Sequence, residues 1–199
     1  MRRHLILFLC LLLLSACSLT PEKTENEQQR QQQWLAKQAQ LNKLSHWKIN
    51  GSIAAYSQQE DWSARFHWRQ QNQAYSLRLH APLGQGMLNL SGDEQGVILK
   101  TAQQTLRAKT PEALLKDDAG ISMPVSYLYY WIRGLPVPTQ PITAQQWNQK
   151  NQLAELQQNG WVIEYERYQQ WDGVLLPKKL RIKNDQYHAK IVISRWELK

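Results

Sequence analysis

Cys17 is the residue of this 199-residue chain whose position most clearly predicts chemistry. It follows two small residues and an apolar run over residues 5–14, and two arginines come before that run. A basic start, about ten apolar residues and small residues before a cleavage point are typical of a secretory signal peptide. Because crossing a bilayer takes roughly 20 apolar residues, this run is too short for a transmembrane helix. The sequence therefore predicts export, with a thiol at the cleavage point.

The tetrapeptide over residues 14–17, Leu-Ser-Ala-Cys, resembles the lipobox of bacterial lipoproteins. The resemblance implies that residues 1–16 are a signal peptide that is removed, and that Cys17 carries acyl chains such as palmitate. Ser18 follows the cysteine, where in well-studied envelopes an Asp favours retention at the inner membrane. The outer membrane, on its periplasmic face, is therefore the expected location. An ordinary signal peptide with a cysteine there by chance is the alternative.

The rest of the sequence contains no recognisable catalytic or metal-binding motif. The mature histidines are His46, His67, His80 and His188. They form no metal-binding doublet such as His-x-x-x-His, and no Gly-x-Ser-x-Gly elbow, P-loop or Rossmann glycine pattern occurs. Asp117 and Asp118 are adjacent and point in different directions on a helix, so a solvated helix end explains them better than a carboxylate pair. We therefore expect neither an enzyme nor a cofactor or metal site.

Charge and composition favour lipid or acidic partners. Removing Arg2 and Arg3 with the signal leaves 22 Lys and Arg against 16 Asp and Glu, a net charge of about +6. Phospholipid head groups and acidic protein surfaces fit that balance, whereas export makes nucleic acid the least expected partner. The sequence contains nine Trp and eight Tyr, whose side chains combine an apolar ring with a polar tip and suit a boundary between an apolar region and water. An aromatic-rich β-core explains them as well. Cys10 leaves with the signal, so no disulfide is expected.

We predict three parts along the chain. Residues 1–16 are the cleaved signal, and residues 17–30, which are polar and without apolar periodicity, are the lipidated cysteine and a flexible tether. Residues 31–199 form a single domain that is long enough to bury a substantial core. Three apolar side chains in the segment over residues 27–44 fall near one helical face, so this segment is expected to be an amphipathic helix that packs on the domain.

Strict alternation predicts antiparallel strands with one wet face. Over residues 62–69 every second side chain is apolar, and those between are Ser, Arg, His and Arg. Further segments with this pattern are residues 49–55, 75–80, 88–90, 97–99, 180–183 and 191–196. Asn159-Gly160 favours a tight hairpin between residues 153–157 and 161–168. Period two with one apolar face is typical of an antiparallel sheet, here of about ten strands.

Two short helices are expected to interrupt these strands. Thr110 before Pro111 is an N-cap followed by proline at the first helical position, and this helix should run to Asp118. A second helix should begin near Pro124 and end before Gly134. Its apolar face contains Val125, Leu128, Trp131 and Ile132. The elements together predict a mainly β (α+β) domain that helices close or nearly close.

The basic run over residues 178–183 has two interpretations. At strand period it is the wet face of one strand, which is the simpler interpretation. The alternative is part of a positive rim near a mouth or a membrane.

Several segments resemble, in order, the LolB family of outer-membrane lipoproteins. They are residues 63–68 (Ser-Ala-Arg-Phe-His-Trp), 81–84 (Ala-Pro-Leu-Gly), 131–136 (Trp-Ile-Arg-Gly-Leu-Pro), 158–160 (Gln-Asn-Gly) and 193–199. No single motif is specific, but the ordered set covers most of the mature chain. The resemblance implies an incomplete antiparallel β-barrel of about ten to eleven strands, covered by a few helices and enclosing an apolar cavity.

The resemblance also implies a function and partners. It implies a monomeric transfer factor that accepts lipoproteins from the periplasmic carrier LolA, holds their acyl chains and inserts them into the inner leaflet of the outer membrane, in contact with its phospholipid. Leu83 matches an exposed leucine that is important for insertion in the family, and with Pro82 and Gly84 it forms the expected membrane-insertion loop. This chain departs from the family pattern in placing Gly84 and Gly86 around Gln85.

Eight residues are the candidates for contact with acyl chains. They are Phe66, Trp68, Leu77, Leu79, Leu90 and Leu99 on the strands, and Trp131 and Ile132 on the covering helix. A cavity wall and a filled core share one sequence pattern. A lipid-anchored structural or interaction protein of the cell envelope, with a filled β-core, is therefore the alternative.

Overall fold

The computed structural model describes residues 22–57, 61–81, 87–119 and 123–199. It divides into two compact units, residues 1–39 and 40–199. The signal peptide, Cys17 and the expected insertion loop, residues 82–84, lie outside the described residues. Within the described ranges, no helix is both long enough and apolar enough to cross a membrane.

Helix α2 (Glu22–Asn42) begins earlier than the sequence pattern predicts. Residues 22–30, which we assigned to a flexible tether, are helical, so the tether prediction is wrong for that part. The prediction relied on apolar periodicity, but this segment consists mostly of Glu, Gln, Lys and Arg, which favour a helix without any apolar face. The expected packing of this helix on the β-domain stays a prediction.

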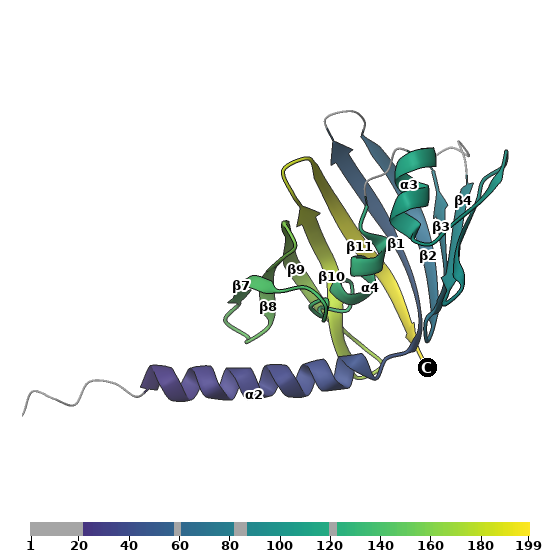
Figure 1. The fold of residues 1–199 in the computed structure, drawn as a ribbon. Helices are drawn as coiled ribbons and strands as arrows, with labels where there is room; N and C mark the ends of the chain where they lie inside the picture. The colour runs from purple at the N-terminus through teal and green to yellow at the C-terminus, as the bar shows by residue number, and fades with distance from the viewer. Residues whose placement is uncertain (1–21, 58–60, 82–86, 120–122) are drawn as a thin grey trace, which may run out of the picture. The chain divides into compact units, whose positions relative to one another are not determined.

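Eleven antiparallel strands form one open sheet, which confirms the expected fold class. The strands are β1 (His46–Ser57), β2 (Trp62–Gln71), β3 (Ala74–His80), β4 (Met87–Asp93), β5 (Gly96–Lys100), β6 (Thr105–Ala108), β7 (Ile142–Trp147), β8 (Leu153–Gln158), β9 (Trp161–Trp171), β10 (Val174–Lys183) and β11 (Tyr187–Leu198). Their order is β6-β5-β4-β3-β2-β1-β11-β10-β9-β8-β7, so the first and last strands pair in the middle and join two meanders (Figure 1).

The expected alternation is present in the sheet. Along β2, Ala64, Phe66 and Trp68 are buried, while Ser63 and Arg65 between them are exposed. The Asn159-Gly160 turn is confirmed, since both residues have positive φ angles, 48° and 75°, as a tight primed turn requires. Strands β6 and β7 were not predicted, because β6 has only four residues and β7 has no clear apolar face.

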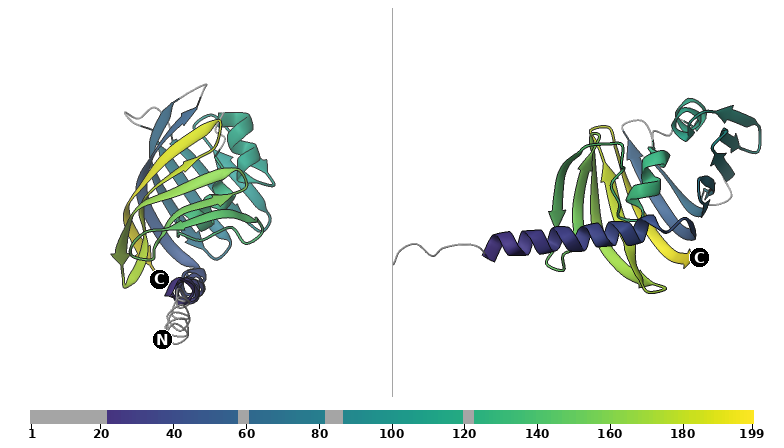
Figure 2. Two further views of the ribbon diagram at one scale, coloured as in Figure 1. Left: turned by 90° about the vertical axis from the view of Figure 1, so that its left-hand side faces the viewer. Right: turned by 60° about the horizontal axis from the view of Figure 1, so that its bottom comes forward.

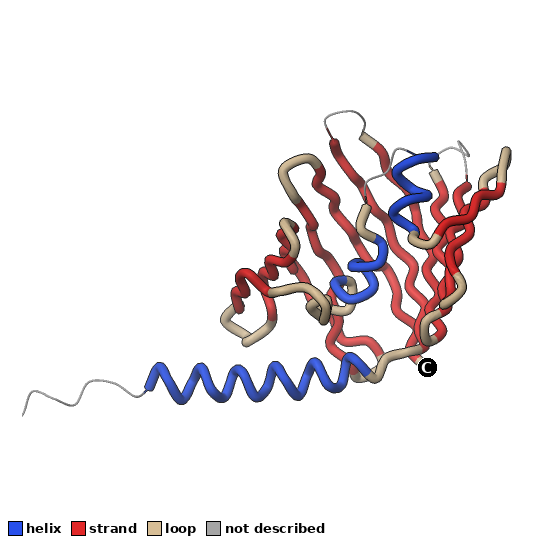
Figure 3. Tube along the Cα trace, viewed as in Figure 1, coloured by secondary structure: helices blue, strands red, loops and turns tan. Residues whose placement is uncertain are grey.

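Two short helices cover the concave face of the sheet, as expected. They are α3 (Pro111–Ala119) and α4 (Val125–Trp131), and Figures 1 and 3 show both lying inside the curve of the strands. The N-cap of α3 is confirmed, because the backbone N–H of Ala113 donates to the hydroxyl of Thr110 at 3.4 Å. Figure 2 shows the curvature of the sheet from two further sides.

The buried amide of Gln158 fixes the C-terminal end of α4 to the sheet. Its Oε1 accepts hydrogen bonds from Trp131 Nε1 at 3.3 Å and from the backbone N–H of Val137 at 2.9 Å. Its Nε2 donates to the carbonyl oxygens of Val137 and Gln140, at 3.1 and 2.9 Å. Both N–H groups of this amide and both lone pairs of its oxygen are therefore used.

Arg133 makes a second buried junction immediately after α4. Its guanidinium, 1% exposed, donates to the carbonyl oxygens of Leu41, Leu44 and Tyr129 at 3.0–3.2 Å. It also lies 4.0 Å above the ring of Tyr129. Burial lowers the pKa of this guanidinium from its ordinary value, and backbone carbonyls with an aromatic face replace the water that it loses.

We expect Gln158→Leu to lower the free energy of unfolding by about 3–5 kcal/mol, because the change leaves the indole N–H of Trp131 and the backbone N–H of Val137 buried without their acceptor and removes one donor from each of two carbonyls. Urea unfolding followed by tryptophan fluorescence measures this. Gln157→Leu is the matched control, since Gln157 is half-buried on the opposite face of the same strand, and it should cost about 1 kcal/mol or less. Equal losses in both variants would contradict the role given to Gln158.

Candidate functional site

An apolar cavity lies between the two short helices and the concave face of the sheet. Every residue that lines it is apolar, and the wall is built from five strands and both helices. The lining residues are Ile53, Trp62, Phe66, Trp68, Leu77, Leu79, Leu88, Leu90, Ile191, Leu115, Met123, Val125, Leu128 and Ile132. The alternation of β2, β3 and β4 produces this wall, because it turns one side chain in two towards the helices.

Six of the eight candidate residues come together on this wall. They are Phe66, Trp68, Leu77, Leu79, Leu90 and Ile132. Leu99 and Trp131 are fully buried but do not line the cavity. Leu99 is paired across the sheet with Leu90 and Leu106, and Trp131 packs its ring against those of Tyr127 and Trp161.

The other lining residues were not among the candidates. Ile53 and Ile191 come from β1 and β11, and Val125 and Leu128 belong to the apolar face that the sequence assigns to α4. Their patterns identify them as buried, but nothing in a single sequence tells which buried residue faces a gap. Leu115, on α3, is buried in the same way and reaches the cavity only through the fold.

The cavity is small in this structure. Its volume is about 40 Å³, a few times the roughly 10–15 Å³ that one water molecule needs by the same measure. Pockets that enclose a drug-sized ligand measure about 300–1,000 Å³, so no acyl chain fits without movement of the wall. The all-apolar lining offers water no hydrogen-bond partner, so the space is expected to be dry.

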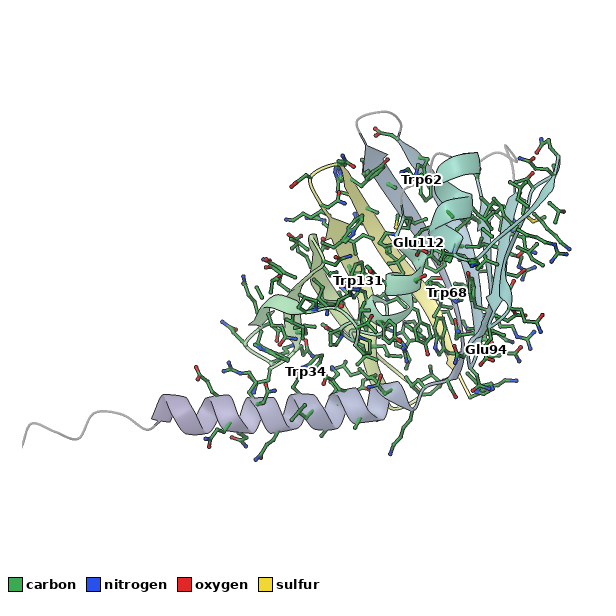
Figure 4. All side chains as sticks on the ribbon, in the orientation of Figure 1. Trp34, Trp62, Trp68, Glu94, Glu112 and Trp131 are labelled. Atoms are coloured by element: carbon green, nitrogen blue, oxygen red, sulfur yellow. The ribbon has the colours of Figure 1, made fainter. Side chains whose placement is uncertain are left out.

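The two helices are the part of this wall that no backbone ladder holds to the sheet. The strands are held by continuous ladders of backbone hydrogen bonds, whereas α3 and α4 meet the sheet through side chains. The carboxylate of Glu112 on α3 accepts hydrogen bonds from the backbone N–H and the hydroxyl of Ser126 on α4, at 2.8 and 3.1 Å. This charge-assisted pair ties the two helices into one unit, and Glu112 is labelled in Figure 4.

Aromatic rings fill the end of the sheet beyond Trp68. The ring of Trp47, 1% exposed, lies 5.4 Å from that of Trp68 and 5.3 Å from that of Trp196. The ring of Tyr129 stacks on Trp47 at 6.3 Å. This packed cluster lies beside the Trp68 end of the cavity, and the half-buried Trp62 lines its other end (Figure 4).

Gly51 leaves room for a ring in the cavity wall. A Cβ atom at this position would lie 2.5 Å from Cζ of Phe66, far inside van der Waals contact. The absence of a side chain on β1 therefore allows the Phe66 ring to lie flat against the sheet. This close approach, and not an unusual φ angle, explains the glycine.

Three of the four cations in the basic run over residues 178–183 form ion pairs within the sheet. Lys179 and Arg181 pair with Glu166, and Lys183 pairs with Glu164, all between β10 and β9. The hydrogen bond from Lys179, with the nearby charge of Arg181, holds the pKa of the Glu166 carboxyl below its usual value. The interpretation as the ordinary wet face of a strand is therefore favoured over that of a positive rim.

The four histidines form no cluster, and only His67 and His80 are neighbours, on the outward face of β2 and β3. Nδ1 of His67 is hydrogen-bonded to the side chain of Asn50, and Nδ1 of His46 to the hydroxyl of Ser45 at 2.9 Å. His188 stacks on Tyr56, and His80 is exposed. Across the described part of the chain, no three His, Cys, Asp or Glu side chains come close enough to hold a metal ion.

Comparisons with known proteins agree on one family. The family model described as outer membrane lipoprotein LolB matches residues 45–196. The outer-membrane lipoprotein LolB of Ectopseudomonas mendocina is 35% identical over 199 residues, which cover 99% of this chain and 97% of that protein. The protein of the same name from Pseudomonas aeruginosa PAO1 is 36% identical over 189 residues, covering 94% of this chain and 92% of that protein.

Solved structures share the fold at low sequence identity. A LolA superfamily protein from Nitrosomonas europaea superposes with a TM-score of 0.52 at 11% identity, over 84% of this chain and 93% of that chain. A DUF1329 family protein from Desulfovibrio piger gives a TM-score of 0.55 at 7% identity, over 82% of this chain and 90% of that chain. These likenesses support the open, helix-covered sheet.

We expect Gly51→Ala to lower the free energy of unfolding by about 1–3 kcal/mol, because the new methyl group would lie 2.4 Å from the backbone oxygen of Val192 and 2.5 Å from the Phe66 ring, so both must shift. Urea unfolding measures the change. The neighbouring substitution Ser52→Ala, at an exposed position, is the control and should stay within about 0.5 kcal/mol of the parent. A Gly51→Ala protein as stable as the parent would show that both groups shift without cost.

Proposed function

This chain belongs to the LolB family of outer-membrane lipoproteins, and from that premise we propose that it accepts lipoproteins from a LolA-type periplasmic carrier and inserts them into the inner leaflet of the outer membrane. Family membership makes it an outer-membrane lipoprotein with a role in lipoprotein localisation. The observation that carries the finer proposal is the cavity, whose lining is apolar throughout and which two separate helices cover.

The proposal rests on the energetics of moving acyl chains. Each buried methylene contributes about 0.8 kcal/mol, so one chain of roughly 16 carbons is worth on the order of 10 kcal/mol. An acylated cargo therefore does not cross water freely, and it passes between apolar sites in a docked pair. Transfer in one direction requires that the receiving cavity bind the chains more tightly than the carrier and less tightly than the bilayer.

The small cavity fits a receiver that must stay soluble while empty. If α3 and α4 move away from the sheet, they expose the apolar wall, and an incoming acyl chain covers that same surface. Without cargo the helices return and leave a space of only about 40 Å³. Binding therefore replaces the contact between the helices and the apolar wall by a contact between the acyl chain and the same wall. The free energy needed for opening is offset only when an acyl chain is present.

A lipid-anchored structural or interaction protein with a filled β-core is the second candidate. The small volume of the cavity is the observation that favours it. Titration with a fluorescent fatty acid discriminates between the two, because a filled core gives no saturable binding.

The direct test of the proposal is transfer of cargo. The protein is mixed with a LolA-type carrier that is loaded with a labelled lipoprotein, and the label is followed by pull-down of each protein. We expect the label to move to this chain and then to added liposomes. Cargo that stays on the carrier would refute the proposal.

The segment around Leu83 is proposed to deliver the cargo to the bilayer. Residues 81–86 connect β3 to β4, and on either side of them Leu79 and Leu88 line the cavity. Met87, which begins β4, is a large apolar side chain that is 54% exposed. The cavity wall thus continues in sequence directly into the expected insertion loop, residues 82–84.

We expect Leu88→Trp to weaken binding of the fluorescent fatty acid by at least about tenfold. The larger ring fills the cavity, and excluding only two methylenes costs that much. Asn89→Trp is the matched control, because Asn89 is the next residue on the same strand and points to the opposite face. Fluorescence titration of both variants, after circular dichroism has shown them folded, measures the difference. Equal affinities would exclude the cavity as the binding site.

For Leu83→Glu, we expect normal acceptance of cargo from the carrier and loss of release into liposomes, since a carboxylate does not enter the apolar part of a bilayer. The transfer assay with and without liposomes separates the two steps, and Leu83→Met is the conservative control. Normal release by the glutamate variant would remove the proposed role of Leu83.

A further inference from the structure

The outward face of the sheet, behind the apolar cavity, contains a second hollow of about 740 Å³. Much of its lining comes from residues that alternate with the cavity wall, and Ile53 lines both spaces. Arg65 precedes Phe66, His80 follows Leu79, and Lys190 precedes Ile191. The two spaces therefore lie at the same level of the strands, on opposite faces of one sheet.

Basic side chains gather around this hollow. Arg65 is directly opposite His80 in the β2–β3 ladder, and Arg78 is the next outward-facing residue on β3. We call Arg65, Arg78, His80 and Lys190 the basic face, and all four are exposed. In the described parts of the chain, none of the ion pairs involves Arg65 or Arg78. This differs from the cations of β10, which pair with Glu164 and Glu166.

Amphipathic and apolar side chains lie at the same end of the strands. Tyr56, 40% exposed, lines the hollow and stacks on His188 at 4.8 Å. Met87, 54% exposed, is paired with His80 across β3 and β4. Exposed tyrosine and apolar side chains beside unpaired cations are typical of surfaces that contact the interface of an anionic membrane.

We propose that the basic face docks this protein on bilayers that contain anionic phospholipid, with lipid phosphates bound by Arg65, Arg78 and Lys190. Trp62, Leu79 and Leu88 lie near the ends of their strands and line the edge of the cavity. Docking through the basic face holds this edge at the lipid surface. The exposed Tyr56 and Met87 favour a bilayer over an acidic protein surface as the occupant. This inference does not depend on cargo transfer, because it concerns binding of the empty protein.

The test uses the full chain carrying Cys17→Ala, so that an acyl anchor does not dominate binding. Sedimentation with vesicles of phosphatidylcholine, alone or mixed with phosphatidylglycerol, measures the affinity at low and high salt. We expect binding to the mixed vesicles that salt weakens, and little binding to the neutral ones. Because one cation near an anionic surface is worth about fivefold in affinity, Arg65→Gln with Arg78→Gln should lower binding by roughly 25-fold.

The matched control is Lys179→Gln with Arg181→Gln, which removes the same charge from the outward face of β10, where both side chains pair with Glu166. We expect this control to bind the mixed vesicles within about threefold of the parent. Equal losses of vesicle binding in the two double variants would overturn the proposal, since binding would then depend on the net charge of the protein and not on the basic face. It would also be overturned if the Arg65, Arg78 variant kept its vesicle binding but lost acceptance of cargo from the carrier, because the basic face would then dock a protein. Circular dichroism of both variants establishes that they are folded.

Discussion

The fold depends on covering one face of an open sheet. Eleven antiparallel strands turn an apolar face inward and never close into a ring, so the inner face must be buried by something other than strands. Helices α3 and α4 do this, and Gln158 fixes only one end of α4, with four buried hydrogen bonds. The other end is tied to α3 through Glu112 and Ser126. In the proposed function, this cover opens without loss of the fold.

Period-two alternation made most of the sheet predictable, because it reflects a local rule about which way side chains point. It assigned β2 and its inward residues Phe66 and Trp68 correctly. The same rule could not separate Leu90, on the cavity wall, from Leu99, which is paired with it on the next strand and packed away from the gap. That difference depends on where α4 lies, and its position is set by contacts far apart in the sequence.

Elements without an apolar pattern were the ones that sequence reasoning missed. The first turns of α2 are helical because of residue propensity, and β7 is held by pairing with β8 instead of by a buried face of its own. Charge was misleading for a related reason. The run over residues 178–183 is the most basic segment of the sequence, but its partners on β9 are visible only once the strand register is known. The less conspicuous Arg65 and Arg78 have no such partners in the described residues.

The two faces of the sheet place the proposed steps of transfer on one structural element. Because successive residues of a strand point to opposite sides, a segment such as Arg65-Phe66 or Leu79-His80 contributes both to the apolar cavity and to the basic face. In the proposed docked state, the side chain that binds lipid phosphate is one Cα–Cα step of about 3.8 Å from its neighbour in the cavity wall, so both stay at the same level of the strands. An acyl chain that leaves the cavity at that edge meets hydrocarbon before it meets bulk water. Release then follows from the lower free energy of the chain in the bilayer, and no further source of energy is needed.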